Sequence, residues 1–283
     1  MCRLYGLLAN EETKVECSLV HAQNALMMQS RSDLRGKSHS DGWGIGFYHN
    51  SKPELERRAT PAFEDIHFST TAERIFSHAV VAHVRKGTIG GPLPANTHPF
   101  SYGHWTFAHN GTATAFDRLG DRMIQETDPT LQCLRQGETD SEQIFYWLLS
   151  RLSQAGISLD ECCPNLELLT QVVAESIDTL AQRSHEAGAE KPAKLNFLMT
   201  DGVIMLASRW KNSLFHVLRE GIHDCEICGI PHVHHQSGVE YRAVAIASEP
   251  ISHEEWQEIP DRHILAVDRD IKPKLIPIES NVP

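Results

Sequence analysis

The sequence predicts an α+β fold, in which runs of antiparallel strands precede and follow a group of helices along the chain. Residues 195–210 form a predicted hairpin, because two apolar runs flank the turn dipeptide Asp201-Gly202. Segments 141–154 and 165–182 carry apolar residues at helical spacing and stand together in the middle of the chain. Hairpins pair strands antiparallel, and grouped helices differ from the regular βαβ alternation of a parallel sheet. Both observations favour the α+β class.

The first part of the chain alternates strands and helices. The expected elements are a strand at 2–9, a helix at 19–28, a polar glycine-rich loop that runs into a strand at 38–48, a helix at 62–76 and a strand at 78–85. A Gly/Pro-rich loop and a short strand at 104–112 follow, and that strand is expected to end in a turn at Asn110-Gly111. Further strands are expected at 213–219, 241–250 and 263–270. No segment has the composition of a long interdomain linker.

The composition describes an ordinary globular chain. Of its 283 residues, 41% are hydrophobic and 22% are charged, which excludes global disorder. The formal net charge is −11, which argues against nucleic acid and anionic membranes as partners. Apolar runs such as 79–84 are far shorter than the ~20 residues of a spanning helix, and the N-terminus lacks the long apolar run of a signal peptide. We therefore expect a cytoplasmic location.

Cys2 is the first candidate for chemistry. Removal of Met1 would leave a residue that carries both a thiol and a free α-amino group, whose pKa of about 7.7–8.0 suits a general base. One residue would then supply both nucleophile and base. The alternative is an unprocessed start with a buried thiol.

Two charged residues are candidates for substrate binding. Arg85 stands at the end of a predicted strand, with Thr88 in the loop that follows, and an arginine there can bind a carboxylate bidentately. Asp140 precedes a predicted helix and can receive a substrate ammonium group. The alternatives are a surface ion pair for Arg85 and a helix N-cap role for Asp140, with Thr139 or Ser141 as other cap candidates.

Two loops complete the candidate site. The Asn110 side-chain amide and the Gly111 backbone N–H together could form an oxyanion hole. His98 lies in the Pro-containing segment THPF. An Asn-Gly pair is also a common hairpin turn, and this alternative stays open.

Taken in order, the segments Met1-Cys2, DGWGIGF, HVRKGT, N-T-HPF, AHNGT and ETDSE resemble the class II glutamine amidotransferase family of N-terminal-nucleophile hydrolases. The matching segments cover roughly residues 2–150. The resemblance implies an αββα four-layer sandwich with two mostly antiparallel sheets. It also implies one glutamine amidotransferase type-2 domain at 2–283, with the last ~30 residues as an alternative extension.

The resemblance assigns roles to residues of this chain. It implies that Cys2 is nucleophile and base and that Asn110 and Gly111 form the oxyanion hole. It implies substrate contacts for Arg85 with the α-carboxylate and Asp140 with the α-ammonium, supported by Thr88 and His98. The sequence Arg85-Lys86-Gly87-Thr88-Ile89 departs from the Arg-Trp-Ala-Thr-His of sugar-phosphate members, since the Trp and the second His are missing.

The same resemblance predicts a γ-glutamyl hydrolase. The chain has no P-loop and no dinucleotide fingerprint, and we expect no synthase domain and no required cofactor. It looks most like the short, synthase-free branch, with the ergothioneine-pathway γ-glutamyl hydrolase and the amidotransferase-like subunit of glutathione degradation. The expected partner is a small zwitterionic γ-glutamyl substrate, with a partner enzyme subunit or a homo-oligomer as further expectations. A non-catalytic metabolite-binding protein is the alternative.

A second cluster lies near the C-terminus. The spacing Cys225-x2-Cys228-x3-His232 suits zinc, and His234 and His235 follow. A distant second pair of ligands is missing from the pattern, so ligands would have to come from this loop or from elsewhere in the fold. The alternative is a His-rich loop with reduced thiols.

Overall fold

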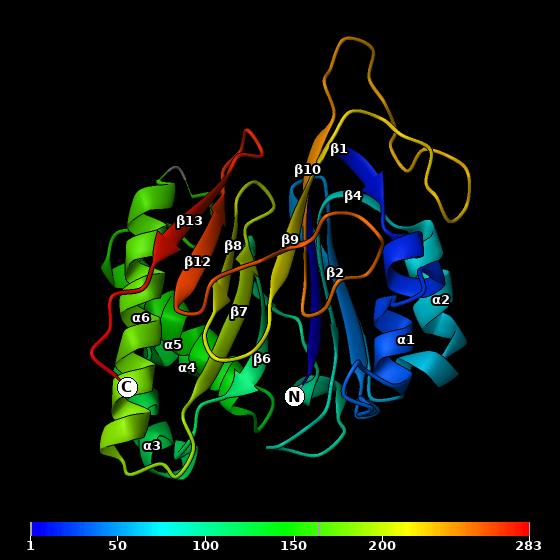
Figure 1. The fold of residues 1–283 in the computed structure, drawn as a ribbon. Helices are drawn as coiled ribbons and strands as arrows, with labels where there is room; N and C mark the ends of the chain where they lie inside the picture. Colours follow the sequence, from blue (N-terminus) through cyan, green and yellow to red (C-terminus); the bar gives the residue numbers. More distant parts are fainter. Residues whose placement is uncertain (1, 164, 283) are drawn as a thin grey trace.

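The protein is built in four layers, helices, sheet, sheet and helices, in a computed structural model that describes residues 2–163 and 165–282 (Figure 1). Strands pair antiparallel in both sheets. The predicted αββα arrangement is therefore confirmed. The domain boundary at 2–283 stays a prediction.

The first sheet has β1 and β4 at its centre. Within the described residues its strand order is β11-β9-β10-β1-β4-β2-β3. The strands are β1 (Arg3–Lys14), β2 (Trp43–His49), β3 (Lys52–Arg58), β4 (Phe76–Val84), β9 (Phe215–Glu220), β10 (Arg242–Ala247) and β11 (Gln257–Glu258). Arg3 pairs with Val84, so the residue before β1 lies beside the residue after β4.

The second sheet follows the order β13-β12-β8-β7-β6-β5 in the described part of the chain. Its strands are β5 (Phe100–Tyr102), β6 (Trp105–Thr112), β7 (Lys194–Thr200), β8 (Met205–Arg209), β12 (His263–Val267) and β13 (Pro273–Pro277). The predicted hairpin at Asp201-Gly202 is confirmed as the β7–β8 connection.

Helices cover the outer faces of both sheets (Figure 1). α1 (Leu26–Arg31) and α2 (Ile66–Arg74) lie against the first sheet, whereas α5 (Asp140–Gln154) and α6 (Leu166–Glu186) lie against the second. The remaining helical segments are α3 (Phe116–Glu126), α4 (Pro129–Gln132), the π-helical turn η1 (Cys17–His21) and the 3-10 turns η2 (Ala62–Glu64) and η3 (Pro94–Asn96). Amphipathic α5 and α6 bury their apolar stripes, as predicted.

Three predictions about local structure are wrong. The helix expected at 19–28 is divided between η1 and α1, because the backbone leaves helical geometry at Ala22 (ψ 151°) and at Ala25 (ψ 157°). Between them, the side chain of Asn24 donates to the Pro250 carbonyl at 2.7 Å. The helix expected at 62–76 is divided at Asp65, whose carboxylate accepts the His67 N–H and caps α2. The predicted turn at Asn110-Gly111 does not exist, because both residues lie inside β6 and pair with β7.

Three apolar cores separate the four layers. One lies between the sheets and the other two lie between each sheet and its helices. Among the described residues, we find no helix with the length and apolar character needed to cross a membrane.

Candidate active site

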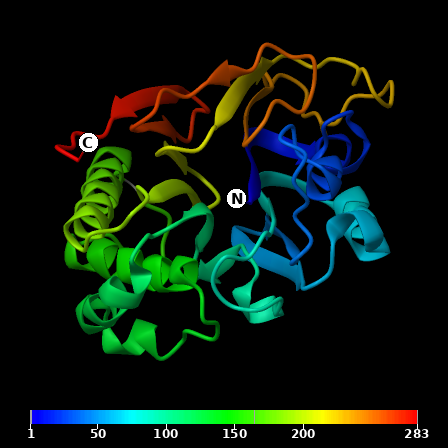
Figure 2. The same ribbon diagram turned by 60° about the horizontal axis from the view of Figure 1, so that its bottom comes forward.

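Cys2 lies directly before β1, the strand that starts beside the label N in Figure 2. Its side chain is buried, and the Lys86 backbone N–H donates to its Sγ at 3.3 Å. Burial raises the pKa of the Cys2 thiol, although the Lys86 N–H and the charge of Arg85 act in the opposite direction. The thiol is therefore protonated near neutral pH, so nucleophilic attack needs a base. Met1, whose removal would free the amine of Cys2, lies outside the described residues.

Arg3 fixes the backbone of Cys2. Its guanidinium donates to the Cys2 carbonyl at 2.9 Å and to a Glu249 carboxylate oxygen at 2.7 Å, and it also pairs with Asp33. All three charged side chains are buried. Because a buried charge requires compensation, this cluster holds the start of β1 in one position.

Arg85 follows β4 and is wrapped by its own loop. Its guanidinium donates to the carbonyls of Ile89 at 2.8 Å, Gly90 at 2.9 Å and Gly91 at 3.1 Å. Arg85 is 2% exposed, so the alternative of a surface ion-pair residue is wrong. Its positive charge nevertheless acts on Cys2.

The DGWG segment supports this loop. The Gly87 N–H donates to Asp41 Oδ2 at 2.8 Å, and the Arg85 N–H donates to the Gly42 carbonyl at 2.7 Å. Gly42 has φ +136°, and a Cβ atom there would lie 2.9 Å from the Arg58 carbonyl oxygen. A glycine is therefore required where the two loops meet.

Asn110 is linked to the start of β1 through Ser248. Its Nδ2 donates to Ser248 Oγ at 3.2 Å, and the same oxygen accepts the Leu4 N–H at 2.9 Å. The Oδ1 of Asn110 is buried and has no partner among the described residues. The structure therefore brings Asn110 and its neighbour Gly111, both in the second sheet, to the end of the first sheet where Cys2 lies.

Asp140 is the first residue of α5 and is 4% exposed. Its carboxylate accepts the Ala113 N–H at 2.8 Å and the Ser141 N–H at 2.9 Å. Thr139 is the N-cap, because its side chain accepts the Glu142 N–H, so the cap alternative for Asp140 is wrong. The negative charge of Asp140 raises the pKa of Cys2, after the larger effect of burial.

The two supporting residues have different surroundings. Thr88 is exposed, and its Oγ1 lies 3.2 Å from Thr112 Oγ1. His98 is buried against His83, with ring centroids 4.2 Å apart, and against Phe100. Burial lowers the pKa of both histidines well below the ordinary value, so both rings are neutral at pH 7. His98 is thus packed inside the fold.

Sequence reasoning missed Arg3, Asp33, Glu249 and Ser248, which position the predicted residues. The signal for the last two was the polar dipeptide Ser248-Glu249 directly after the apolar run AVAIA. The contacts of Arg3 join residues far apart in the chain, so no local sequence pattern could predict them.

The predicted metal candidates lie elsewhere. Cys225, Cys228 and His232 gather near Cys17, beyond the opposite end of β1 from Cys2. This strand of 12 residues is roughly 35 Å long at about 3.3 Å per residue. The two sites are therefore separate.

Comparison with known proteins agrees with this geometry. The model of the family described as "Glutamine amidotransferases class-II" matches residues 1–275 of this chain. A γ-glutamyl-hercynylcysteine sulfoxide hydrolase of Mycobacterium tuberculosis is 28% identical over 273 residues, covering 94% of this chain and 93% of that protein. A probable glutamine amidotransferase of Saccharomyces cerevisiae is 28% identical over 298 residues, covering 95% and 82%.

The fold is shared with a solved structure of the glutamine phosphoribosylpyrophosphate amidotransferase from B. subtilis. The TM-score is 0.62 at 14% identity, and the match covers 99% of this chain and 50% of that chain. With its four-layer fold and the family match over nearly its whole length, the chain belongs to the class II glutamine amidotransferases and is an enzyme of that family.

Proposed function

We propose that this enzyme hydrolyses the γ-glutamyl amide bond of glutamine or of a γ-glutamyl compound through a thioester on Cys2. The observation that carries the proposal is the position of the buried Cys2 thiol. It interacts electrostatically with both a buried cation, Arg85, and a buried anion, Asp140. Opposite charges beside a nucleophile suit a substrate with both an α-carboxylate and an α-ammonium group.

The first step needs a base because the Cys2 thiol is protonated. After removal of Met1, the α-amine of Cys2 accepts the thiol proton while Sγ attacks the γ-carbonyl carbon. A C–S bond forms and the carbonyl π electrons move to oxygen. Asn110 Nδ2 and the Gly111 N–H donate to this oxyanion.

The tetrahedral intermediate then collapses. The C–N bond breaks, and ammonia or an amine leaves with the proton held by the α-ammonium group of Cys2. Water attacks the resulting thioester, the amine again accepts a proton, and glutamate and the free thiol are released. Atoms and charges balance without a cofactor.

Arg85 retains donors for the substrate. A guanidinium has five N–H donors, and loop carbonyls receive three of the hydrogen bonds that Arg85 makes. The remaining donors can bind an α-carboxylate once the loop adjusts. Arg85 would therefore bind the α-carboxylate after a change in the loop that now surrounds its guanidinium.

Three alternatives to glutamine hydrolysis by this chain alone concern the leaving group, a partner enzyme and catalysis itself. The mycobacterial relative is named a γ-glutamyl-hercynylcysteine sulfoxide hydrolase, which favours a γ-glutamyl compound over glutamine as substrate. A glutaminase-like subunit would show strong activity only with its partner enzyme, whereas a non-catalytic metabolite-binding protein would bind without turnover. A cytoplasmic location would keep the Cys2 thiol reduced.

The test combines intact mass with a substrate screen. We expect the native protein to lack one methionine and to hydrolyse glutamine or a γ-glutamyl amide or peptide. Cys2→Ala keeps the α-amine but removes the thiol, so activity should fall by at least about 10³-fold. Cys133→Ala, at an exposed cysteine, is the control and should retain activity. Full activity in Cys2→Ala, or a retained Met1 in an active protein, would contradict the mechanism.

A further inference from the structure

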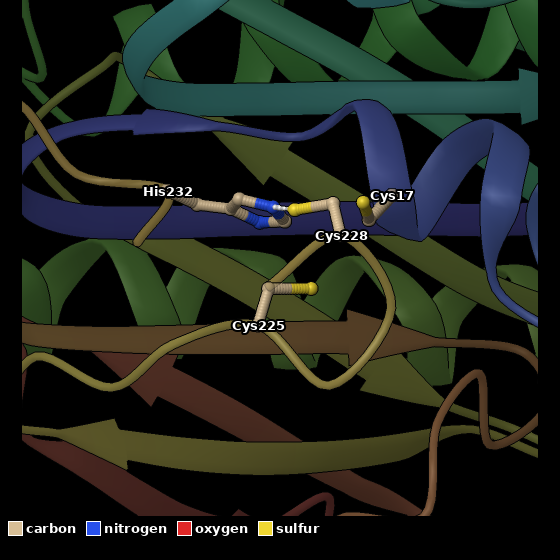
Figure 3. A group of neighbouring side chains, drawn as sticks. All are labelled: Cys17, Cys225, Cys228 and His232. Atoms are coloured by element: carbon tan, nitrogen blue, oxygen red, sulfur yellow. Dashed lines mark hydrogen bonds between the residues drawn. The ribbon is translucent and has the colours of Figure 1, made fainter. Parts of the chain in front are cut away.

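Four potential metal ligands meet where the loop between β9 and β10 reaches the end of β1. The ligand atoms of Cys17, Cys225, Cys228 and His232 all lie within 4.8 Å of one another (Figure 3). Cys17 begins η1, while the other three residues belong to segment 221–241, which connects the two strands. Two regions far apart in the chain thus contribute to one cluster.

The spacing suits a tetrahedral ion. With Zn–S bonds of about 2.3 Å and Zn–N bonds of about 2.0 Å, neighbouring ligand atoms stand roughly 3.5–3.8 Å apart. The Cys228 Sγ and His232 Nε2 atoms are 3.0 Å apart, and no pair exceeds 4.8 Å. Shifts of about 1 Å or less would therefore complete the tetrahedron.

The Cys225–Cys228 turn is already shaped for two sulfur ligands. The Cys225 carbonyl accepts the Gly229 N–H at 2.8 Å, and the Ile227 N–H donates to Cys225 Sγ at 3.4 Å. Gly229 has φ +72°, which lets the chain reverse immediately after the second cysteine. Backbone donors to sulfur stabilise a thiolate, the form that binds a metal.

β1 positions the histidine. The Lys14 N–H donates to the His232 carbonyl at 2.7 Å, and the His234 N–H donates to the Glu12 carbonyl at 3.1 Å. These bonds extend the sheet and bring His232 to the strand that leads into Cys17. The ligand set therefore rests on backbone pairing as well as on side-chain proximity.

Apart from its two ends and Val233, which pack against the apolar core of the first sheet, segment 221–241 has little apolar burial. Ile227 and Ile230 are 45% and 56% exposed, and most residues from 223 to 240 are exposed. A chain segment of this length needs compensation for its lost conformational entropy, which a metal cross-link can supply.

We propose that Cys17, Cys225, Cys228 and His232 bind one zinc ion that clamps segment 221–241 to η1. Three thiols release three protons on binding, and the neutral imidazole contributes the fourth donor, so the complex carries one negative charge. Three cysteines and one histidine are a structural zinc set without an open position for substrate. Cys17 is the fourth ligand, which the Cys-x2-Cys-x3-His spacing did not predict.

The first experiment is metal analysis of tag-free protein purified without chelators. We expect about one zinc per chain in the wild type and in Cys133→Ser, the exposed-cysteine control. Cys17→Ser and Cys228→Ser should each lose most of the zinc. Iron in place of zinc, an absence of metal, or full zinc retention in Cys17→Ser would overturn the proposal.

Cobalt substitution tests the ligand set directly. Co²⁺ bound to the wild type should show intense visible bands of a tetrahedral site and a sulfur-to-metal charge-transfer band. With Co²⁺ in excess, the Co²⁺ that Cys17→Ser still binds should show roughly a third less charge-transfer intensity per bound ion, since one of three thiolates is removed. An unchanged band would exclude Cys17. An intact mass showing a disulfide among these cysteines in freshly isolated protein would exclude the zinc site.

A third measurement connects the metal to the fold. A strong chelator should lower the thermal midpoint of the wild type and leave that of Cys17→Ser unchanged. Equal responses of the two proteins would contradict a structural clamp. None of these readouts depends on catalysis, so they stand whether or not Cys2 is the nucleophile.

Discussion

At the scale of single residues, His39 is buried near the start of β1, where protonation of its ring is unfavourable. Its ring is fully buried, and Nε2 lies 3.1 Å from Asp33 Oδ2. Burial, followed by the nearby charge of Arg3, lowers the pKa of His39 from its ordinary 6.5 to about 4, although Asp33 acts in the opposite direction. The folded protein therefore holds His39 neutral where the unfolded chain would protonate it.

This shift predicts a pH dependence of stability. Between pH 6.5 and about 4 the unfolded chain binds more protons at this position, so the free energy of unfolding falls as the pH falls. His39→Gln cannot be protonated, and its stability should decline less steeply over that interval. Urea unfolding at several pH values measures the slopes.

The exposed histidine His49 provides the control. His49→Gln should keep the slope of the wild type. Equal slopes for His39→Gln and the wild type would contradict the assignment of this pH dependence to His39. Buried His83 and His98 should leave a residual slope in every variant.

Some site residues could be recognised from sequence and others could not. Arg85 and Asp140 stand at predicted element ends within distinctive local segments, and the structure buries both near Cys2. Ser248 and Cys17 act only through partners far along the chain. Their roles depend on the packing of strands and loops, which no local pattern encodes.

At the scale of elements, β6 approaches β7 too closely for a side chain at Gly111. A Cβ atom there would lie 1.8 Å from the Lys194 carbonyl oxygen and 2.4 Å from His109 Nε2. The glycine thus belongs to a strand contact, whereas the sequence suggested a turn. Glycine is required here because the Lys194 carbonyl of β7 leaves no room for a Cβ atom, and not because the backbone needs a special conformation.

Gly111→Ala should therefore destabilise the protein by about 1–3 kcal/mol, as overpacking of an ordered interior does. Activity should also fall, because displacement of β6 moves the adjacent Asn110. Gly91→Ala is the matched control, since a Cβ there meets nothing within 4 Å. Chemical denaturation measures both variants, and equal stability of Gly111→Ala and the wild type would contradict the described contact.

The periodic spacing of apolar residues predicted the long helices correctly. It failed for shorter elements, whose limits depend on individual residues. α5 and α6 are long enough for their apolar stripes to be clear. Strand β3 was not predicted, because Lys52–Arg58 is rich in charged residues, as edge strands often are. The predicted helices are interrupted at Asp65, which caps α2, and at Ala22 and Ala25, where the backbone leaves helical geometry.

At the scale of the whole molecule, the two sheets share one apolar core. Leu198 of β7 is buried in that core, and a Cβ at Gly6 of β1 would lie 2.7 Å from its Cδ2 atom. The sequence indicated strands and helices, but the face-to-face packing of the sheets followed only from the family resemblance. Hairpin signals do not specify which strands join which sheet.

The shared core predicts that both sheets unfold together. Leu198→Ala should lower the free energy of unfolding by about 2–5 kcal/mol, because it removes buried methyl groups and leaves a cavity. Far-UV circular dichroism and tryptophan fluorescence should follow one coincident urea transition in both proteins. Trp43 reports on the helical layer of the first sheet, and Trp105 and Trp147 report on that of the second.

Leu275→Ala is the control, since Leu275 is 42% exposed on β13 and should change stability by less than about 1 kcal/mol. Two separate transitions would mean that each sheet unfolds with its own helices, and would contradict the single domain predicted at 2–283. A single transition that shifts for every probe in Leu198→Ala is expected, because the substitution removes a contact that belongs equally to both sheets.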